Sequence, residues 1–478
     1  MCIRDRLTPY LNKPITFAQL IAARTAITKY YTKNNYITSG AFIPPQTMAD
    51  NGTVTLRVVE GKVGEINVNI QGRLNENYIK SRLEKATTAP LNQEKLLYAL
   101  QLLQIDPLVK TISAELSSGV RPDTSRLDIR IETANPWQIE TISNNGRAPS
   151  VGTFRRGVEV SHRNVTGFGD SLNTLYTNTD GSDMVEVSYA IPLNSSNGRI
   201  ELFYRHRDNK VVESPFERLD IESNSNTYRL SFSQPIMQTP WQTLTLGLSA
   251  IKRDSQTSIL GKNYPLSEGA DENGETKLSI LQLFQDYELR GKNQVLAFNS
   301  QLNVGLGILD ATKNSNEPDG RFLYWRGQGQ WVRELSKNTL LVVGADLQLS
   351  PFDLVPKEQF GLGGYRSVRA YRQDTRLTDN GALGTVELRL PLPWISGKNR
   401  LFQVVPFIDG GVAWNSDGKE EEGSKALAAA GVGLQVNLWE KINMRLDYGI
   451  PLVDVDSRDK TAQEEGFYFS FSTTPFSF

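Results

Sequence analysis

The chain has 478 residues, enough for two to four domains, and a formal net charge of −1 at pH 7. This near-neutral charge gives no long-range attraction to nucleic acid, so we expect no nucleic-acid partner. The single cysteine, Cys2, excludes disulfides within the chain and metal sites built from several cysteines. No run of about 18 apolar residues predicts a transmembrane helix.

Two small α+β modules are predicted at the start of the chain, over residues 1–61 and 62–135. The second has the order β-α-α-β-β, with helices at 75–86 and 93–104 and strands at 63–70, 109–116 and 126–131. Its second helix follows a capping residue, Asn92, and has a predicted buried stripe of Leu96, Leu97, Leu100 and Leu103. The first module is an incomplete copy, with a helix at 17–34 and strands at 36–43 and 53–59.

Sixteen short stretches of alternating polar and apolar residues run from Trp137 to Phe478. In the stretch 243–251, for example, leucines and an alanine occupy the even positions, and smaller or polar residues occupy most of the odd ones. A period of two residues predicts β-strands with two different faces. The predicted strands begin near residues 137, 152, 170, 184, 199, 225, 241, 276, 293, 321, 338, 382, 401, 425, 441 and 466.

The connections between these strands alternate between short and long. The short ones include 192–198, 290–292, 334–337 and 439–441; the long ones include 208–224, 253–275, 308–320, 350–380, 416–423 and 453–465. Short turns at one rim and long loops at the other are typical of bacterial outer-membrane barrels. A closed barrel can cross lipid because all its backbone polar groups are paired internally. We therefore predict a transmembrane, antiparallel 16-stranded β-barrel over residues 136–478; the alternative is a soluble β-sandwich.

Residues 1–6 do not resemble a secretory leader, because they have neither an apolar core nor a small-residue cleavage site. An outer-membrane protein must be exported. We therefore expect that the chain is truncated at its N-terminus or carries a foreign start.

Three motifs suggest a family. The first module and its exit into the second contain Tyr30-Tyr31, Asn35-Tyr36, Pro44-Pro45-Gln46 and the run 58–63. The longest loop contains Gly363-Gly364-Tyr365-Arg366-Ser367-Val368-Arg369-Ala370-Tyr371, and the thirteenth strand contains Phe407-Ile408-Asp409-Gly410-Gly411. With two modules ahead of a 16-stranded barrel, the chain resembles the two-partner secretion transporters, or haemolysin activation/secretion proteins, whose modules are polypeptide-transport-associated (POTRA) repeats.

The resemblance implies that the loop 350–380 folds inward and that Arg369, at its tip, meets Asp409 on the barrel wall. The implied loop motif comprises Gly363, Gly364, Val368, Arg369, Ala370 and Tyr371, and its partner on the wall comprises Phe407, Asp409 and Gly411. On the residues alone, Arg369 could instead be a solvated charge, with Asp409 paired to another lumen residue.

Position 370 departs from the family pattern, which has glycine there. Alanine disfavours a positive φ, so either the backbone is not left-handed at Ala370 or the loop tip packs differently. At the C-terminus, Phe476 and Phe478 resemble the assembly signal of outer-membrane barrels. They could equally belong to an ordinary aromatic girdle.

The resemblance implies a translocase in the outer membrane of a Gram-negative-type bacterium, with its modules in the periplasm. Its expected partners are one large exoprotein, unfolded in transit, outer-membrane lipid and lipopolysaccharide, and the barrel assembly machinery. No Gly-x-x-x-x-Gly-Lys-[Ser/Thr] sequence predicts nucleotide binding, so we expect transport without ATP and without a cofactor. The alternatives are a factor that inserts other barrels and, less favoured, a passive porin.

An enzyme is not expected. The two histidines, His162 and His206, have no nucleophile elbow or metal-ligand spacing beside them, and we expect both to be solvated or interfacial. The long loops repeat no calcium-loop spacing. We therefore predict neither catalytic residues nor a metal site.

Overall fold

The computed structural model describes residues 3–47, 52–121, 123–316, 318–397, 399–418, 425–455 and 461–474. The chain forms two compact units, one from residues 1–134 with 166–169 and the other from 135–165 with 170–478. Among the helices in these described ranges, none is both long and apolar enough to cross a membrane.

The first unit contains an α+β module with the expected order β-α-α-β-β. Its elements are β3 (Lys62–Gln71), α3 (Glu76–Glu84), α4 (Gln93–Gln104), β4 (Val109–Ser118) and β5 (Thr124–Thr133). In its three-stranded sheet, β5 pairs in parallel with β3 and antiparallel with β4. Asn75 and Asn92 cap the two helices, because their side-chain oxygens accept the backbone N–H groups of Asn77 and Lys95.

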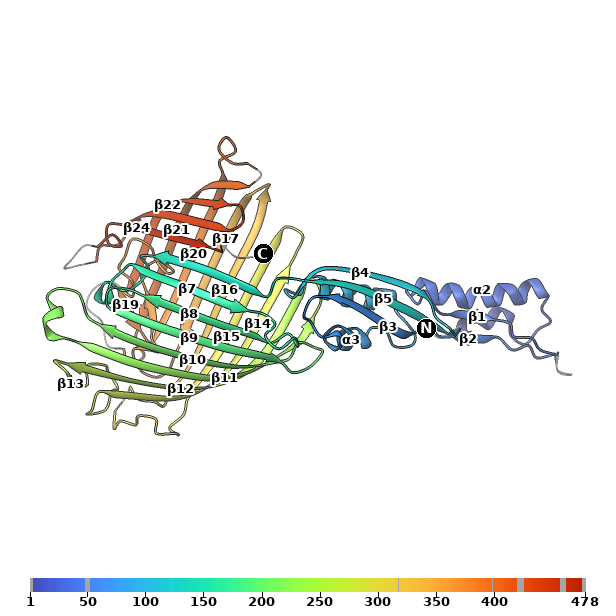
Figure 1. Cartoon of the computed structure of the whole chain (residues 1–478), viewed down its shortest axis with the longest axis horizontal. Coiled ribbons are helices and arrows are strands. Elements are labelled where there is room, and N and C mark those ends of the chain that lie inside the picture. Colours follow the sequence, from blue (N-terminus) through green and yellow to red (C-terminus); the bar gives the residue numbers. More distant parts are fainter. Residues whose placement is uncertain are drawn as a thin grey trace. The chain divides into compact units, whose positions relative to one another are not determined.

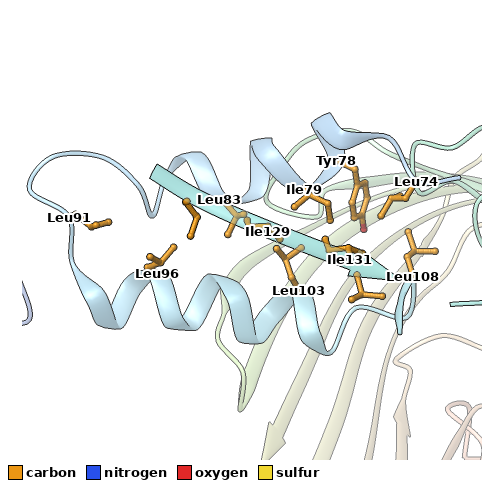
Figure 2. Packing of buried hydrophobic residues seen from close by; sticks show 12 residues of the cluster. Leu74, Tyr78, Ile79, Leu83, Leu91, Leu96, Leu103, Leu108, Ile129 and Ile131 are labelled. Carbon is orange, nitrogen blue, oxygen red and sulfur yellow. The ribbon is translucent and has the colours of Figure 1, made fainter. Parts of the chain in front are cut away.

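Both helices contribute to the core of this module (Figure 2). Ile79 on α3, Leu103 on α4 and Ile129 on β5 are all buried in one cluster. The expected stripe on α4 is wrong at one position, because Leu97 is 47% exposed. Successive residues of a helix are rotated by about 100° from one another, so Leu97 points away from the face that Leu96 buries.

The residues before this module form a smaller α+β arrangement: α1 (Ile3–Leu7), the 3₁₀ turn η1 (Thr8–Tyr10), α2 (Phe17–Lys33), β1 (Gly40–Phe42) and β2 (Arg57–Val59). A reciprocal capping box of Thr16 and Gln19 starts α2. Both strands are shorter than expected. The chain turns at Asn35, where φ is +66°, and Pro44 has no N–H with which to extend the β1–β2 ladder.

The second unit is a closed antiparallel barrel of sixteen long strands (Figure 1). They are β6 (Trp137–Asn144), β7 (Arg155–His162), β8 (Ser171–Asn178), β9 (Ser182–Pro192), β10 (Arg199–Lys210), β11 (Glu222–Gln238), β12 (Gln242–Ile259), β14 (Glu275–Arg290), β15 (Gln294–Gly305), β16 (Leu323–Ser336), β17 (Thr339–Leu349), β20 (Asn380–Pro391), β21 (Arg400–Trp414), β22 (Ala426–Leu438), β23 (Ile442–Pro451) and β24 (Phe467–Thr473). Each begins within three residues of its expected start. The barrel prediction is confirmed, and the sandwich is excluded.

The alternation along each strand separates an outer from an inner face. On β21, Ile408 is 54% exposed and Val412 also faces outward, whereas Asp409 is 1% exposed. On β12, Leu246 and Leu248 are exposed, whereas Ser249 is buried. An apolar outer face and a polar lumen are what a barrel in lipid requires.

The strands close into a cylinder where the last one, β24, meets the first, β6. Among the described residues, which end at Thr474, four pairs join them, from Ser470 with Asn144 to Thr473 with Thr141. By comparison, β23 and β24 share seven pairs. Over the part of the chain that the structure describes, the closing seam is therefore the shortest ladder between adjacent long strands of the barrel.

Candidate functional site

Residues 350–380, which follow β17 and end at the first residue of β20, fold back against the inner wall of the barrel; we call this segment the transport loop, after the role that the family resemblance implies. Two short strands inside it, β18 (Phe360–Leu362) and β19 (Arg376–Thr378), pair as an antiparallel hairpin. Leu362 and Val368 are fully buried, in a cluster with Leu427 and Ala429 from the inner face of β22. The transport loop is thus packed as a core element and is not a solvated surface loop.

The tip of the transport loop meets the wall through a paired arginine. Arg369 donates from Nε to Asp409 Oδ2 at 2.7 Å and from Nη2 to Asp409 Oδ1 at 2.8 Å. Its backbone N–H also donates to Asp409 Oδ2, at 3.2 Å. Arg369 is only 4% exposed, so this bidentate pair is shielded from water, and its geometry is the strongest available to an arginine and a carboxylate.

The pair belongs to a larger network of inward-facing charges. Arg369 Nη1 donates to Glu387 Oε1 on β20 at 2.9 Å. Arg445 on β23 joins Glu387 at 2.7 Å and Asp447 at 2.8 Å. Because each buried charge has an opposite partner within hydrogen-bonding distance, the desolvation cost of burying it is offset.

An aromatic ring closes the network on another side. The guanidinium carbon of Arg369 lies 3.4 Å from the ring centroid of Phe407, a cation–π contact. Gly431 on β22 makes room for that ring, because a Cβ there would lie 2.4 Å from Phe407 Cζ. At Gly411, a Cβ would lie 2.5 Å from Leu362 Cδ1, so this glycine lets the transport loop approach the wall closely.

The backbone around Arg369 is held in an unusual conformation. Ala370 has φ +74°, so it is left-handed and carries a methyl group where glycine would be unstrained. Gly363 and Gly364, at φ +104° and +105°, form the turn that faces it, and the Gly364 N–H donates to Val368 O at 3.0 Å. The next residue, Tyr371, anchors this conformation, since its hydroxyl lies 2.8 Å from Ala428 O.

A second arginine fixes the outer part of the transport loop. Arg372 donates through both terminal nitrogens to Glu213, in the loop between β10 and β11, with 2.6 Å between Nη1 and Oε1. It also lies 3.7 Å from Glu464, in the segment before β24. Arg372 therefore ties the transport loop to two other barrel loops.

Known proteins identify this arrangement. A family model described as haemolysin secretion/activation protein ShlB/FhaC/HecB matches residues 123–436, which is well over half of the chain. The chain belongs to this haemolysin secretion/activation family. A second model, the ShlB-type POTRA domain, matches residues 3–61.

Relatives in sequence and structure agree with the family assignment. The haem/hemopexin transporter protein HuxB of Haemophilus influenzae is 22% identical over 98% of this chain and 83% of its own length. The outer membrane transporter CdiB of Dickeya dadantii is 22% identical over 93% of this chain and 78% of its own. The solved structure of CdiB from Escherichia coli has a TM-score of 0.73 and 19% identity, and the match covers 98% of this chain and 87% of that one.

This family member is therefore an outer-membrane transporter of the two-partner secretion type, with POTRA modules in the periplasm. Two-partner secretion implies a secreted exoprotein as partner. The family is one of transporters, which favours this function over the barrel-assembly and porin alternatives.

Sequence reasoning named Arg369 and Asp409 but missed Glu387, Arg445 and Asp447. All three lie on the inner face of the barrel, and the period-two pattern places them there. The pattern does not reveal which inward residues meet across strands and loops. The named pair Phe476 and Phe478 lies outside the described residues.

Of the two positions expected for the histidines, solvated or interfacial, the structure excludes the solvated one for His162. His162 is buried, not solvated, and its ring packs edge-on against Trp137 with 4.6 Å between centroids. Its Nδ1 accepts the backbone N–H of Asn164, so this side chain stabilises a turn. His206 is partly exposed and contacts Asn226 and Asp208, each at 2.9 Å.

Proposed function

We propose that this transporter secretes one large exoprotein, unfolded in transit, through the lumen of its barrel and without ATP. The observation that carries the proposal is the buried network that holds Arg369, and with it the transport loop, against the barrel wall. In this proposal the network sets the loop in a transport-competent position. Folding of the exoprotein outside the cell supplies the drive.

The periplasmic modules receive the exoprotein in this proposal. In the three-stranded sheet of the first unit, β3 and β4 are the outer strands, and each has one side that no described strand pairs with. An extended chain can add to such an edge through main-chain hydrogen bonds, with little demand on its sequence. That suits a receptor for a long and varied unfolded segment.

Two further partners are part of the proposal. The outward-facing apolar residues of the barrel, such as Leu246 and Ile408, would contact outer-membrane lipid and lipopolysaccharide. The C-terminal residues Phe476 and Phe478 would be recognised by the barrel assembly machinery during insertion. The exposed apolar residues favour contact with lipid, because the outer face of a transmembrane barrel is solvated by hydrocarbon chains and not by water.

The test removes the side chain at the centre of the network. Arg369→Ala leaves Asp409 buried without its main partner, which typically costs about 3–5 kcal/mol. We expect secretion of the exoprotein to fall at least about tenfold at equal surface abundance, because that energy is ample to displace the loop. Secreted and cell-associated exoprotein are measured by immunoblot in a strain that expresses both partners.

Arg218→Ala is the matched control. Arg218 is an exposed arginine in the loop between β10 and β11, 3.9 Å from Glu217, and its loss should leave secretion unchanged. Wild-type secretion by Arg369→Ala would refute the role of the network. A general fall in other outer-membrane barrels on deletion of this protein, with normal secretion, would instead indicate an assembly factor.

A further inference from the structure

Five cations inside the barrel lie beyond ion-pairing distance of every carboxylate that the structure describes. They are Arg147, between β6 and β7, Arg155 on β7, Arg207 on β10, and Lys357 and Arg366 in the transport loop; we call them the lumenal basic cluster. In the part of the chain that the structure describes, none of the five forms an ion pair with a carboxylate. The Nε atoms of Arg155 and Arg207 are buried and have no hydrogen-bond partner.

These cations act on one another. Arg207 experiences the charge of Arg147, and Arg155 experiences the charges of Arg147 and Arg366. Three nearby carboxylates offset part of this charge: Glu186 pairs with Arg205 at 2.6 Å, Glu358 pairs with Arg253, and Asp374 attracts Arg147 from beyond ion-pairing distance. The cluster therefore carries an excess of positive charge that the barrel itself does not neutralise.

The cluster can be reached from the open part of the lumen. Arg366 is exposed and lines a cavity of about 630 Å³ along β12 and β14 to β17. Three carboxylates also line this cavity: Asp346 is paired with Arg326 at 2.7 Å, Glu288 is paired with Arg290 at 2.6 Å, and Asp286 accepts a hydrogen bond from Asn299. An anion that enters the cavity would find free guanidinium donors on Arg366, the member of the cluster that lines it.

We propose that the lumenal basic cluster binds carboxylate groups of the polypeptide in transit. The proposal rests on the secretion function proposed above, because that function places an unfolded chain in this lumen. A guanidinium group binds a carboxylate with two parallel hydrogen bonds, and such bonds are strongest where water is partly excluded. Several neighbouring cations in the lumen would hold an acidic segment transiently and slow its backward slippage.

The first test measures charge selectivity of the purified full chain in planar lipid bilayers under a KCl gradient. Arg155→Gln/Arg207→Gln should move the reversal potential towards potassium, because two unneutralised positive charges leave the lumen. The control is Glu201→Gln/Arg229→Gln. These two residues form a 2.9 Å ion pair on the same wall, so removing both leaves the net charge unchanged, and the reversal potential should not move.

The second test asks whether the site takes a polypeptide. A ten-residue oligo-glutamate should block the wild-type current at about tenfold lower concentration than it blocks the double variant, since each charge-assisted contact contributes substantially. Oligo-lysine of equal length should block neither preferentially. Arg366→Gln provides a second variant whose exposed position makes misfolding no explanation, and it should weaken the block in the same direction.

Three outcomes would overturn the proposal. The reversal potential of the double variant could equal that of wild type, or oligo-glutamate could block all proteins alike. Pyrophosphate could block while oligo-glutamate does not, which would make this a site for small anions only. Because these readouts need no exoprotein, they stand apart from the secretion assay, whose failure would refute the proposed function instead.

Discussion

The Arg369 side chain combines ion pairs, hydrogen bonds and a cation–π contact. It pairs in a bidentate manner with Asp409, donates to Glu387 and stacks on Phe407. Lysine could supply the charge but not the planar fork, so the network selects arginine. These contacts hold Arg369 in place and restrict the backbone on both sides of it. They therefore stabilise the unfavourable left-handed conformation of Ala370.

We predict that Ala370→Gly is nearly neutral and that Ala370→Val is damaging. Glycine relieves a left-handed strain of about 1–2 kcal/mol. It also costs about 0.5–1 kcal/mol in chain entropy and loses one buried methyl, about 0.8 kcal/mol, so the effects nearly cancel. Valine adds two methyl groups to the Cβ of residue 370, and that Cβ lies only 3.1 Å from where a Cβ on Gly449 would stand, so little space remains for them.

The measurement is the temperature at which the folded barrel loses its anomalous mobility in SDS gels. Glycine should leave it within a few degrees of wild type, whereas valine should lower it clearly. An equal, large drop for both variants would contradict a left-handed backbone at this position.

For single residues, the sequence predicts a place in the site only where the residue belongs to a motif. Arg369 and Asp409 each lie in a recognisable run of residues. Glu387 and Arg445 lie in ordinary alternating strands, and their meeting depends on the register of four neighbouring strands and on the path of a loop. The sequence does not predict the positive φ of Ala370, because alanine gives no local signal for a left-handed backbone.

Helices and strands lie where the sequence predicts them if the apolar periodicity and the capping residues indicate the same boundaries. The helix α4 begins directly after its cap, Asn92, and the alternating strands fix both their number and their starts. The expectation fails where context decides: β1 is cut to three residues between a turn and a proline, and Leu97 is exposed despite its apolar side chain.

The helix α4 offers a matched pair of substitutions. Leu103 is 2% exposed in the core of its module, and Leu97 on the same helix is 47% exposed. We predict that Leu103→Ala destabilises the module by about 2–5 kcal/mol, through lost burial and a remaining cavity. Leu97→Ala should change its stability by less than about 0.5 kcal/mol.

Limited proteolysis of the intact transporter in detergent checks this prediction. Cleavage within residues 62–133 should accelerate in Leu103→Ala while the barrel stays resistant, and Leu97→Ala should be cleaved like wild type. Equal sensitivity of the two variants would show that α4 is oriented differently from the arrangement described here.

At the scale of the whole barrel, the transport loop and the closing seam are connected. The short β24–β6 ladder is supplemented by Asn145, whose side chain donates to Phe467 O at 2.8 Å and accepts from the Phe469 N–H at 2.9 Å. Gln463 donates to Arg147 O at 2.8 Å and accepts from the backbone of Gln373 at 2.9 Å. A displacement of the transport loop would therefore remove contacts that help to keep the seam closed.

The charge inside the barrel also depends on pH through Lys357. The Lys357 side chain is exposed to the lumen, but the surrounding protein removes part of its hydration. This desolvation lowers the pKa of Lys357 to about 7. Repulsion from Arg253 and Arg207 lowers the pKa further, whereas attraction by Glu358 opposes the shift. An unfolded lysine titrates near 10.4. Between the two values the unfolded chain binds the extra proton, so the contribution of Lys357 to stability rises with pH from about 7 to 10.

The same titration changes what the lumen attracts. As pH rises from 6 to 8, Lys357 loses its charge and the lumenal basic cluster loses one of its five cations. We predict that the reversal potential under a KCl gradient shifts towards potassium over this range, and that Lys357→Gln removes most of the shift. Because the other four cations of the cluster are arginines, the preference should change in degree and not in sign. A shift of equal size in Lys357→Gln would assign the titration to another group.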